Sequence, residues 1–149
     1  WLGHTIPELR KIRSNSIGAE RALDVEALNQ VDDMISFIEN AANDPKKLPR
    51  ATIVRYAHDL TLFSRELHRV CREGADVVTV IGNSTLRGNY IQNDMLVCQA
   101  YENAGFRRKN RTERALPESK RYLPVRTSNA KSSMAKRMRT EVVLTVEKA

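Results

Sequence analysis

Residues 75–81, ADVVTVI, form a run that is nearly continuous in β-branched side chains and does not alternate with polar ones. Such a run is typical of a strand buried on both faces, as in a parallel sheet with helices on each side. A polar stretch with two glycines, GNSTLRG, follows at residues 82–88 and reads as a loop. Open α/β sheets hold ligands at the carboxyl ends of their strands. This segment therefore constrains both the fold class and the place of a site.

Helical patterns flank the strand on both sides. Residues 25–43 carry apolar side chains at three- and four-residue spacing, and the pattern stops before Pro45. A second helix is expected from residue 52, on a stripe made of Ala57, Leu60, Phe63, Leu67 and Val70. A third is expected from Tyr90 to Ala104, and a short turn from Pro7 to Ile12. The expected caps are Thr52 and Gly74 for the second helix, and Asn89 and Gly105 for the third. This alternation of helix, strand and helix predicts an α/β fold.

The C-terminal part departs from that alternation. Residues 106–116 are charged almost throughout, which favours an edge strand. Residues 117–138 read as a long basic loop, and 140–148, TEVVLTVEK, as a second buried strand. Two strands that are joined by a loop, with no crossover helix between them, are expected to pair in antiparallel orientation. We therefore expect a sheet that ends in an antiparallel hairpin, with residues 1–50 and 51–149 as the two parts of the chain.

The basic charge lies mainly in this C-terminal part. Residues 107–149 hold 13 Lys and Arg against 4 Asp and Glu, whereas residues 1–106 hold 12 against 14. Such asymmetry favours a polyanionic partner, nucleic acid first, over the alternative of a solvated basic surface. Cys71 and Cys98 have apolar neighbours and are interpreted as reduced thiols of a cytoplasmic protein.

The loop at residues 82–88 matches no strong ligand motif. It lacks the Gly-Lys-Ser/Thr end of a phosphate-binding loop and the spacing of a dinucleotide-binding loop. One interpretation is a plain strand-to-helix turn. The other is that Asn83, Ser84 and Arg87 lie on the sheet rim and contact a ligand. The three histidines have no metal-ligand spacing, and no nucleophile stands beside a base.

Four separated segments together resemble one family. WLGHTIPELRKIRSNSIGAER at residues 1–21 resembles the stretch that follows the catalytic Pro-Pro-Tyr motif in Rossmann-like nucleic-acid methyltransferases. VVTVIGNSTLRGNYI looks like the next strand and loop of that family, and NDMLVCQAYENAGF looks like its following helix. RMRTEVVLTVEK resembles its last strand, which inserts beside the penultimate parallel strand. The order and spacing of the segments agree with the family across nearly the whole chain.

The resemblance implies a DNA methyltransferase that uses S-adenosylmethionine to methylate adenine N6 or cytosine N4. The family's Gly-rich cofactor loop and its Pro-Pro-Tyr motif do not occur in this sequence. We therefore expect the chain to be the C-terminal half of such an enzyme, with the N-terminal remainder as its partner, and to be inactive alone. The residues that the resemblance places on the substrate side are Arg10, Arg13, Ser16, Asn83, Ser84, Arg87, Arg107, Arg108, Lys109, Arg111, Arg121 and Tyr122.

Two alternatives stay open. An RNA methyltransferase of the tRNA guanine-N2 type shares the fold that the resemblance implies. A non-enzymatic nucleic-acid-binding module would explain the basic C-terminal part without any chemistry. Each arginine also has the alternative of being a solvated surface charge.

Overall fold

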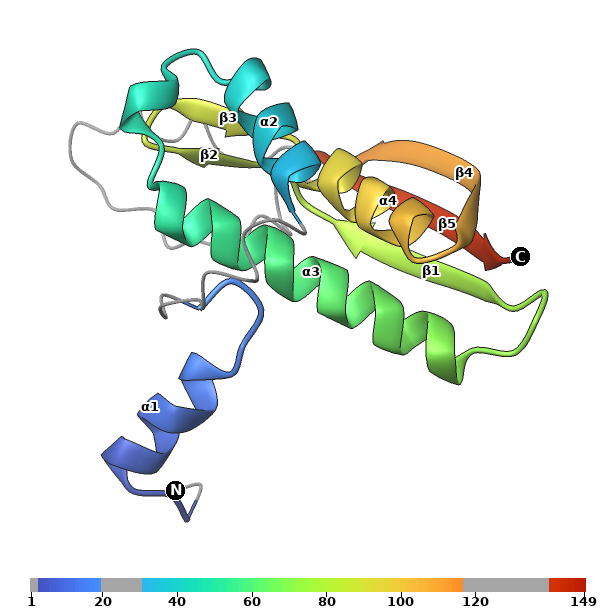
Figure 1. Ribbon diagram of the computed structural model, residues 1–149, viewed down its shortest axis with the longest axis horizontal. Helices are drawn as coiled ribbons and strands as arrows, with labels where there is room; N and C mark the ends of the chain where they lie inside the picture. Colours follow the sequence, from blue (N-terminus) through green and yellow to red (C-terminus); the bar gives the residue numbers. More distant parts are fainter. Residues whose placement is uncertain (1–2, 20–30, 117–139) are drawn as a thin grey trace.

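The computed structural model describes residues 3–19, 31–116 and 140–149 (Figure 1). Its α-helices are α1 (Ile6–Ser14), α2 (Asp32–Ala41), α3 (Arg50–Val70) and α4 (Asn93–Asn103), with a 3₁₀ turn, η2 (Pro45–Lys47), before α3. Its strands are β1 (Asp76–Ile81), β2 (Ser84–Leu86), β3 (Asn89–Ile91), β4 (Phe106–Ala115) and β5 (Thr140–Lys148). The predicted mixture of helices and strands is confirmed. None of the described helices is long and apolar enough to cross a membrane.

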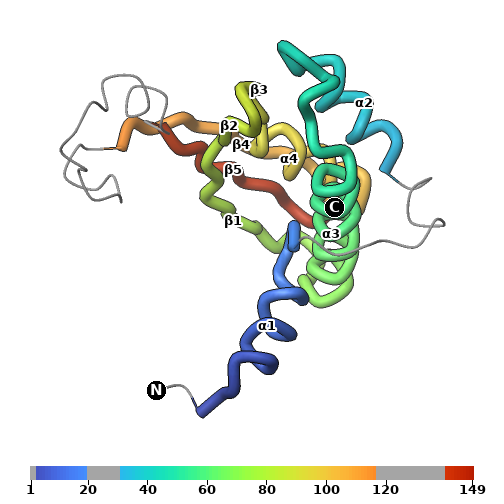
Figure 2. Tube along the Cα trace, turned by 90° about the vertical axis from the view of Figure 1, so that its left-hand side faces the viewer, coloured from blue at the N-terminus to red at the C-terminus, as the bar shows by residue number. Residues whose placement is uncertain are grey.

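Three strands form the main sheet in the order β1-β5-β4. β5 pairs antiparallel with β1, where Val78 faces Thr145, and antiparallel with β4, where Thr112 faces Val143. The predicted antiparallel pairing of the last two strands, with the charged one at the edge, is therefore confirmed. The predicted partial sheet that ends in an antiparallel hairpin is present, whereas the expectation of helices on each side of it is wrong for the described residues. All three strands run antiparallel to their neighbours, and α2, α3 and α4 lie on one side of the sheet (Figure 2).

β1 is buried on one face only. Its odd-numbered residues turn toward the helices, where Ile81 is buried and the Thr79 hydroxyl lies 2.9 Å from the Tyr101 hydroxyl. On the opposite face Val78 is 62% exposed and Val80 is 52% exposed. The expectation of burial on both faces is wrong within the described structure, because an unbroken β-branched run indicates two apolar faces but not what covers them.

α3 supplies the wall against which the other helices pack. Its buried side chains include Ile53, Val54, Ala57 and Leu60, which join residues of α2, α4, β1 and β5 in one core. Of the predicted stripe, Ala57 and Leu60 are buried, whereas Phe63 and Val70 are exposed. Two predicted caps are also wrong. Thr52 lies inside the helix, and Gly74 lies in the turn before β1, where its N–H donates to the carbonyl of Lys148 over 2.9 Å.

The predicted loop at residues 82–88 is partly a β-hairpin. β2 and β3 pair antiparallel, with Leu86 opposite Asn89. Arg87 and Gly88 connect them with φ of 49° and 85°, as a type I′ turn requires of both central residues. The helix predicted from Tyr90 begins three residues later, at Asn93, so Asn89 does not cap it. The predicted end of that helix at Gly105 is confirmed by a φ of 101°.

α1 projects from the rest of the molecule, on the side where β1 forms the sheet edge (Figures 1 and 2). It includes the predicted turn at Pro7–Ile12, and it buries no residue. Glu8 accepts a hydrogen bond from the Thr5 N–H over 2.6 Å, which caps the helix and lowers the pKa of the Glu8 carboxyl. The chain after α1 is tied to α3, because the Gly18 N–H donates to Asp59 over 2.9 Å. The predicted start of the helix over residues 25–43, and the basic loop at 117–138, lie outside the described residues.

Candidate functional site

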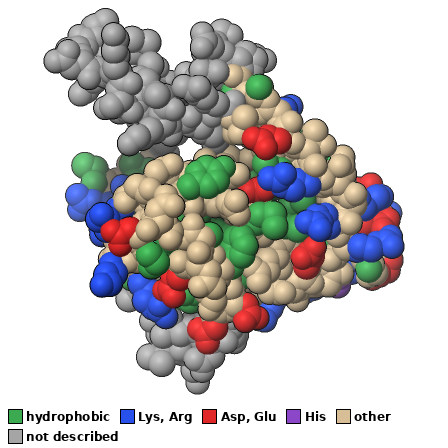
Figure 3. All heavy atoms as spheres, turned by 90° about the horizontal axis from the view of Figure 1, so that it is seen from above, with side chains coloured by type: hydrophobic (Ala, Val, Ile, Leu, Met, Phe, Trp, Pro, Cys, Tyr) green, Lys and Arg blue, Asp and Glu red, His purple; other side chains and the backbone are tan. Residues whose placement is uncertain are grey.

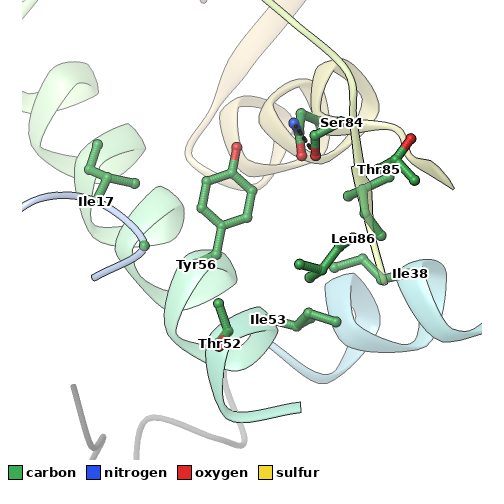
Figure 4. Close-up of a pocket in the computed structure, with 11 residues that line it drawn as sticks. Ile17, Ile38, Thr52, Ile53, Tyr56, Ser84, Thr85 and Leu86 are labelled. Atoms are coloured by element: carbon green, nitrogen blue, oxygen red, sulfur yellow. Dashed lines mark hydrogen bonds between the residues drawn. The ribbon is translucent and has the colours of Figure 1, made fainter. Parts of the chain in front are cut away.

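A cavity of about 360 Å³ lies beside the carboxyl end of β1 (Figure 4). α3 and α2 form one wall, the β2–β3 hairpin forms another, and the segment after α1 closes a side. Tyr56 stands between Ile17 on one side and Leu86 on the other, with its hydroxyl directed toward the end that carries Ser84. The cavity is thus apolar along its walls and polar at the end where β1 stops, which is the usual construction of a small-ligand site.

The polar end is held by the first residues of α4. Asn93 donates from Nδ2 to the Gly82 carbonyl over 2.9 Å and to the Ser84 hydroxyl over 3.1 Å. Asn83 accepts from the backbone N–H of Asp94 over 3.1 Å. Because the Ser84 oxygen already accepts from Asn93, its O–H is left to donate to a ligand. The structure therefore brings one of the predicted site residues, Ser84, to this cavity, whereas Asn83 binds the first turn of α4 and does not line the cavity.

Tyr56 is a cavity residue that the sequence analysis missed. It lies on α3 beside the buried positions Ile53 and Ala57, and burial raises the pKa of its phenol. The hydroxyl consequently stays protonated at neutral pH, and the ring offers a flat apolar surface. Its spacing of three residues from Ile53 places it on the rim of the apolar stripe. That position is the only sequence signal that could have indicated it.

The cavity does not suit S-adenosylmethionine by itself. A nucleoside cofactor with free ribose hydroxyls is normally held by a carboxylate next to a Gly-rich loop. No Asp or Glu of the described residues lines the cavity, and the glycine in its wall, Gly18, donates its N–H to Asp59. Among the described residues, no cluster of three His, Cys, Asp or Glu side chains could hold a metal ion.

Asp94 links the end of β1 to the charged edge strand. It is 2% exposed, and one of its carboxylate oxygens accepts from Arg111 Nε over 2.7 Å. Its other oxygen, Oδ1, is buried without a hydrogen-bond partner in the described structure. Since Asn83 caps α4 at the same residue, Asp94 connects two predicted site residues, Asn83 and Arg111, that come from different parts of the sheet. A buried carboxylate cannot be recognised from the sequence, where Asp94 reads as an ordinary first-turn acid of a helix.

The other predicted cations of β4 are paired with acids. Arg107 pairs with Glu147, and Lys109 lies 2.8 Å from Asp76 and 3.4 Å from Glu147. Arg108 lies 4.0 Å from Glu102. Seen from above, basic and acidic side chains alternate around the rim of the molecule (Figure 3). The positive charge of this strand is therefore largely compensated within the protein.

Other predicted cations have no such partner in the described structure. Arg10 and Arg13 lie on α1, which buries no residue, and Ser16 follows it as an exposed residue. Arg87 lies at the tip of the β2–β3 hairpin and does not line the cavity. Arg121 and Tyr122 lie outside the described residues.

Cys98 is buried and Cys71 is half-buried, and both are free thiols; burial raises the pKa of Cys98.

Comparisons with known proteins show a structural similarity but no sequence match. No family model matches the chain, and no curated protein matches its sequence. Among solved structures, it is similar to a putative DNA modification methylase from Thermus thermophilus, with a TM-score of 0.45 and 15% identity over 62% of this chain. The chain spans 36% of the length of that protein.

Proposed function

We propose that this chain is the substrate-side, C-terminal part of an S-adenosylmethionine-dependent amino-methyltransferase that acts on DNA. The observation that supports this most is the order of the last strands. The family that the sequence resembles places its final strand inside the sheet, beside the preceding parallel strand, and β5 lies between β1 and β4. Topology of this kind is independent of the short motifs that carry the resemblance.

The cavity would then form part of the wall around the target base. The methyl donor supplies an electrophilic methyl group, and the remainder of the enzyme would hold it, because this cavity lacks the groups to do so. The contribution of this chain is positional. Tyr56 offers a flat apolar surface for a base taken out of its stack, and the Ser84 O–H offers one hydrogen-bond donor at the polar end.

The nucleic-acid backbone would meet cations that are not already paired. Arg10 and Arg13 lie on the helix that leads into the cavity wall at Ile17, and no acidic partner compensates them within the described residues. The cations of β4 would contribute less, because each is held by a carboxylate. Phosphate contacts of this kind position a strand without reading its sequence.

The test is methyl transfer by the complete reading frame that contains these residues. We expect radiolabelled methyl groups to pass from S-adenosylmethionine to DNA with the longer chain, and no transfer with the 149-residue chain alone. Ser84→Ala in the longer chain is expected to lower kcat/KM up to about tenfold, the effect of one lost neutral hydrogen bond that positions the base. A longer chain that carries a cofactor loop yet transfers no methyl group to DNA or RNA would contradict the proposal. Transfer to RNA in place of DNA would favour the tRNA guanine-N2 type of enzyme.

A second candidate is a nucleic-acid-binding module without chemistry. The observation that favours it is that no carboxylate of the described residues lines the cavity to hold a nucleoside cofactor. It would be favoured if the complete reading frame adds no Gly-rich loop and no Pro-Pro-Tyr motif while the chain still binds DNA.

A further inference from the structure

The tip of the β2–β3 hairpin carries an arginine in an unfavourable backbone conformation. Among the described residues, Arg87 is the one non-glycine residue with a positive φ, at 49°. Both central positions of a type I′ turn favour Asn or Gly, because a β-carbon is strained there. Because this backbone strain lowers stability, a charged residue that occupies such a position at an exposed tip indicates a role in binding a ligand and not in folding.

A second basic segment is fixed against the same hairpin. Asn89, which is fully buried, accepts from the Asp44 N–H over 2.7 Å and donates to the Asp44 carbonyl over 3.1 Å. These two bonds hold the start of η2 beside the hairpin, so that η2, which contains Lys46, lies near the turn between β2 and β3 (Figure 1). Lys47 is paired with Asp44 over 2.8 Å, whereas neither Lys46 nor Arg87 has an acidic partner in the described structure.

An exposed aromatic ring completes the arrangement. Tyr90 is 50% exposed and lies opposite Thr85 in the register of the hairpin. Because side chains alternate along a strand, Tyr90 points away from the face on which its neighbour Asn89 is buried. The hairpin thus carries unpaired cations at its tip and in η2 on the Asn89 face, and an exposed ring on the other face. A single strand that crosses the tip can meet the cations with its phosphates and stack a base on the ring, which is the combination that binds single-stranded nucleic acid.

The geometry points to a binding site for a single-stranded nucleic-acid segment at this hairpin tip. Arg87 and Lys46 contact phosphates, and Tyr90 stacks on an unpaired base. The site rests on the proposed function, because Ser84 and Leu86 of the same hairpin line the cavity. A strand held at the tip would thus pass beside the cavity, with its stacked base on the outer face of the hairpin, where Tyr90 lies. A duplex offers no unstacked base, so it should gain less from Tyr90 than a single strand does.

Arg87→Asn tests the site with two opposite effects. Asn is favoured in the turn, so the melting temperature should rise by about 2 to 4 °C, while the affinity for a single-stranded oligonucleotide of about 20 nucleotides should fall about fivefold. The slope of log K against log salt concentration should lose about 0.7 in magnitude, the value for one phosphate contact to a single strand. Arg72→Asn is the matched control, because Arg72 is exposed beyond the far end of α3 and has no ionic partner in the described structure. It should leave the affinity within about twofold.

Tyr90→Leu separates base stacking from simple charge attraction. It should weaken binding of the oligonucleotide about fivefold or more and leave binding of inorganic polyphosphate unchanged, because polyphosphate has no bases. Fluorescence anisotropy measures both, with circular dichroism as the check of folding. If the wild-type chain binds the oligonucleotide and Arg87→Asn and Tyr90→Leu bind it equally well, the hairpin site is overturned and the proposed function stands. If the wild-type chain binds no oligonucleotide, the hairpin site is overturned as well, and the proposed function is decided separately by methyl transfer with the longer chain.

Discussion

Asn89 is the residue on which the hairpin depends most. Its amide makes two hydrogen bonds to the backbone of Asp44, and it is fully buried. Asn89→Ala would remove both hydrogen bonds and leave the Asp44 N–H without a partner, whereas the Asp44 carbonyl keeps the Lys47 N–H over 3.1 Å, so we expect a loss of about 1 to 3 kcal/mol in the free energy of unfolding. Urea denaturation followed by circular dichroism measures this loss.

The matched control for Asn89 is Asn40→Ala. Asn40 is exposed on α2, where alanine is the better helix former, so its substitution should change the free energy by less than about 0.7 kcal/mol. Equal effects of the two substitutions would show that the Asp44 contacts contribute nothing to stability.

The role of Asn89 could not be predicted from local sequence. An Asn before an apolar run is a common helix cap, and that interpretation placed the start of the third helix too early. The helix starts at Asn93, because Asn89 is instead satisfied by Asp44, a residue 45 positions away. Contacts at such a separation leave no periodic signal. The same reason explains why Asp94 reads as a surface acid in the sequence, although it is buried beside Arg111.

At the scale of elements, α1 and β4 are expected to contribute differently to nucleic-acid binding. Arg10 and Arg13 of α1 have no ionic partner among the described residues, whereas the cations of β4 are paired, so removing charge from α1 should matter more. We expect Arg10→Gln with Arg13→Gln to weaken binding of a DNA duplex about tenfold at about 0.1 M salt, as expected for two lost phosphate contacts. Arg107→Gln with Arg114→Gln removes the same charge from β4, where Arg114 pairs with Glu141, and should weaken binding less than about threefold. A larger loss of affinity for the β4 double variant than for the α1 double variant would show that the ion pairs of β4 open when nucleic acid binds.

The ion pairs across the main sheet predict a pH dependence. The hydrogen bond from Arg107 and the charge of Lys109 lower the pKa of Glu147 in the folded chain. A carboxyl whose pKa is lower in the folded than in the unfolded state adds stability above its unfolded pKa, and this stability is lost as the pH falls through the folded pKa. Glu147→Gln should therefore lower the melting temperature at about pH 7 and have little effect near about pH 3.

Glu113→Gln provides the control for that pH dependence. Glu113 is an exposed carboxylate of β4 without an ionic partner in the described structure, so its substitution should not change the shape of the pH profile. A Glu147→Gln profile parallel to that of the wild-type chain at all pH values would contradict the role of the network.

The long strands were predictable from sequence and the short ones were not. β1, β4 and β5 have six or more residues each, and their apolar or charged runs placed them nearly at their observed bounds. β2 and β3 have three residues each, which is too short for a periodic pattern, and their Arg-Gly turn lacks the Asn or Asp that usually marks such a hairpin. The cavity was missed in part for this reason, because the hairpin forms one of its walls.

At the scale of the whole molecule, the described sheet is covered on one face and open on the other. Val78 and Val80 lie exposed on the open face of β1, which is also an edge strand of that sheet. Contiguous apolar side chains on a sheet face are usually buried against another layer. The proposed function supplies such a layer, since the remainder of the enzyme would continue the sheet and bring helices to its second face.

Substitution of both Val78 and Val80 by threonine tests whether another layer covers the open face. The double variant is made in the 149-residue chain and in the complete reading frame. Threonine suits a strand as well as valine does, so in the 149-residue chain the double variant should change the free energy of unfolding by less than about 1 kcal/mol. In the complete reading frame, where the proposed function has further helices cover the same face, it should cost about 2 to 4 kcal/mol, because two hydroxyls lose water without gaining partners. Val142→Thr, at a buried position of β5, should be costly in both chains. An equally small effect of the double variant in both chains would mean that nothing covers the open face, and that the sheet is not continued there by the rest of an enzyme.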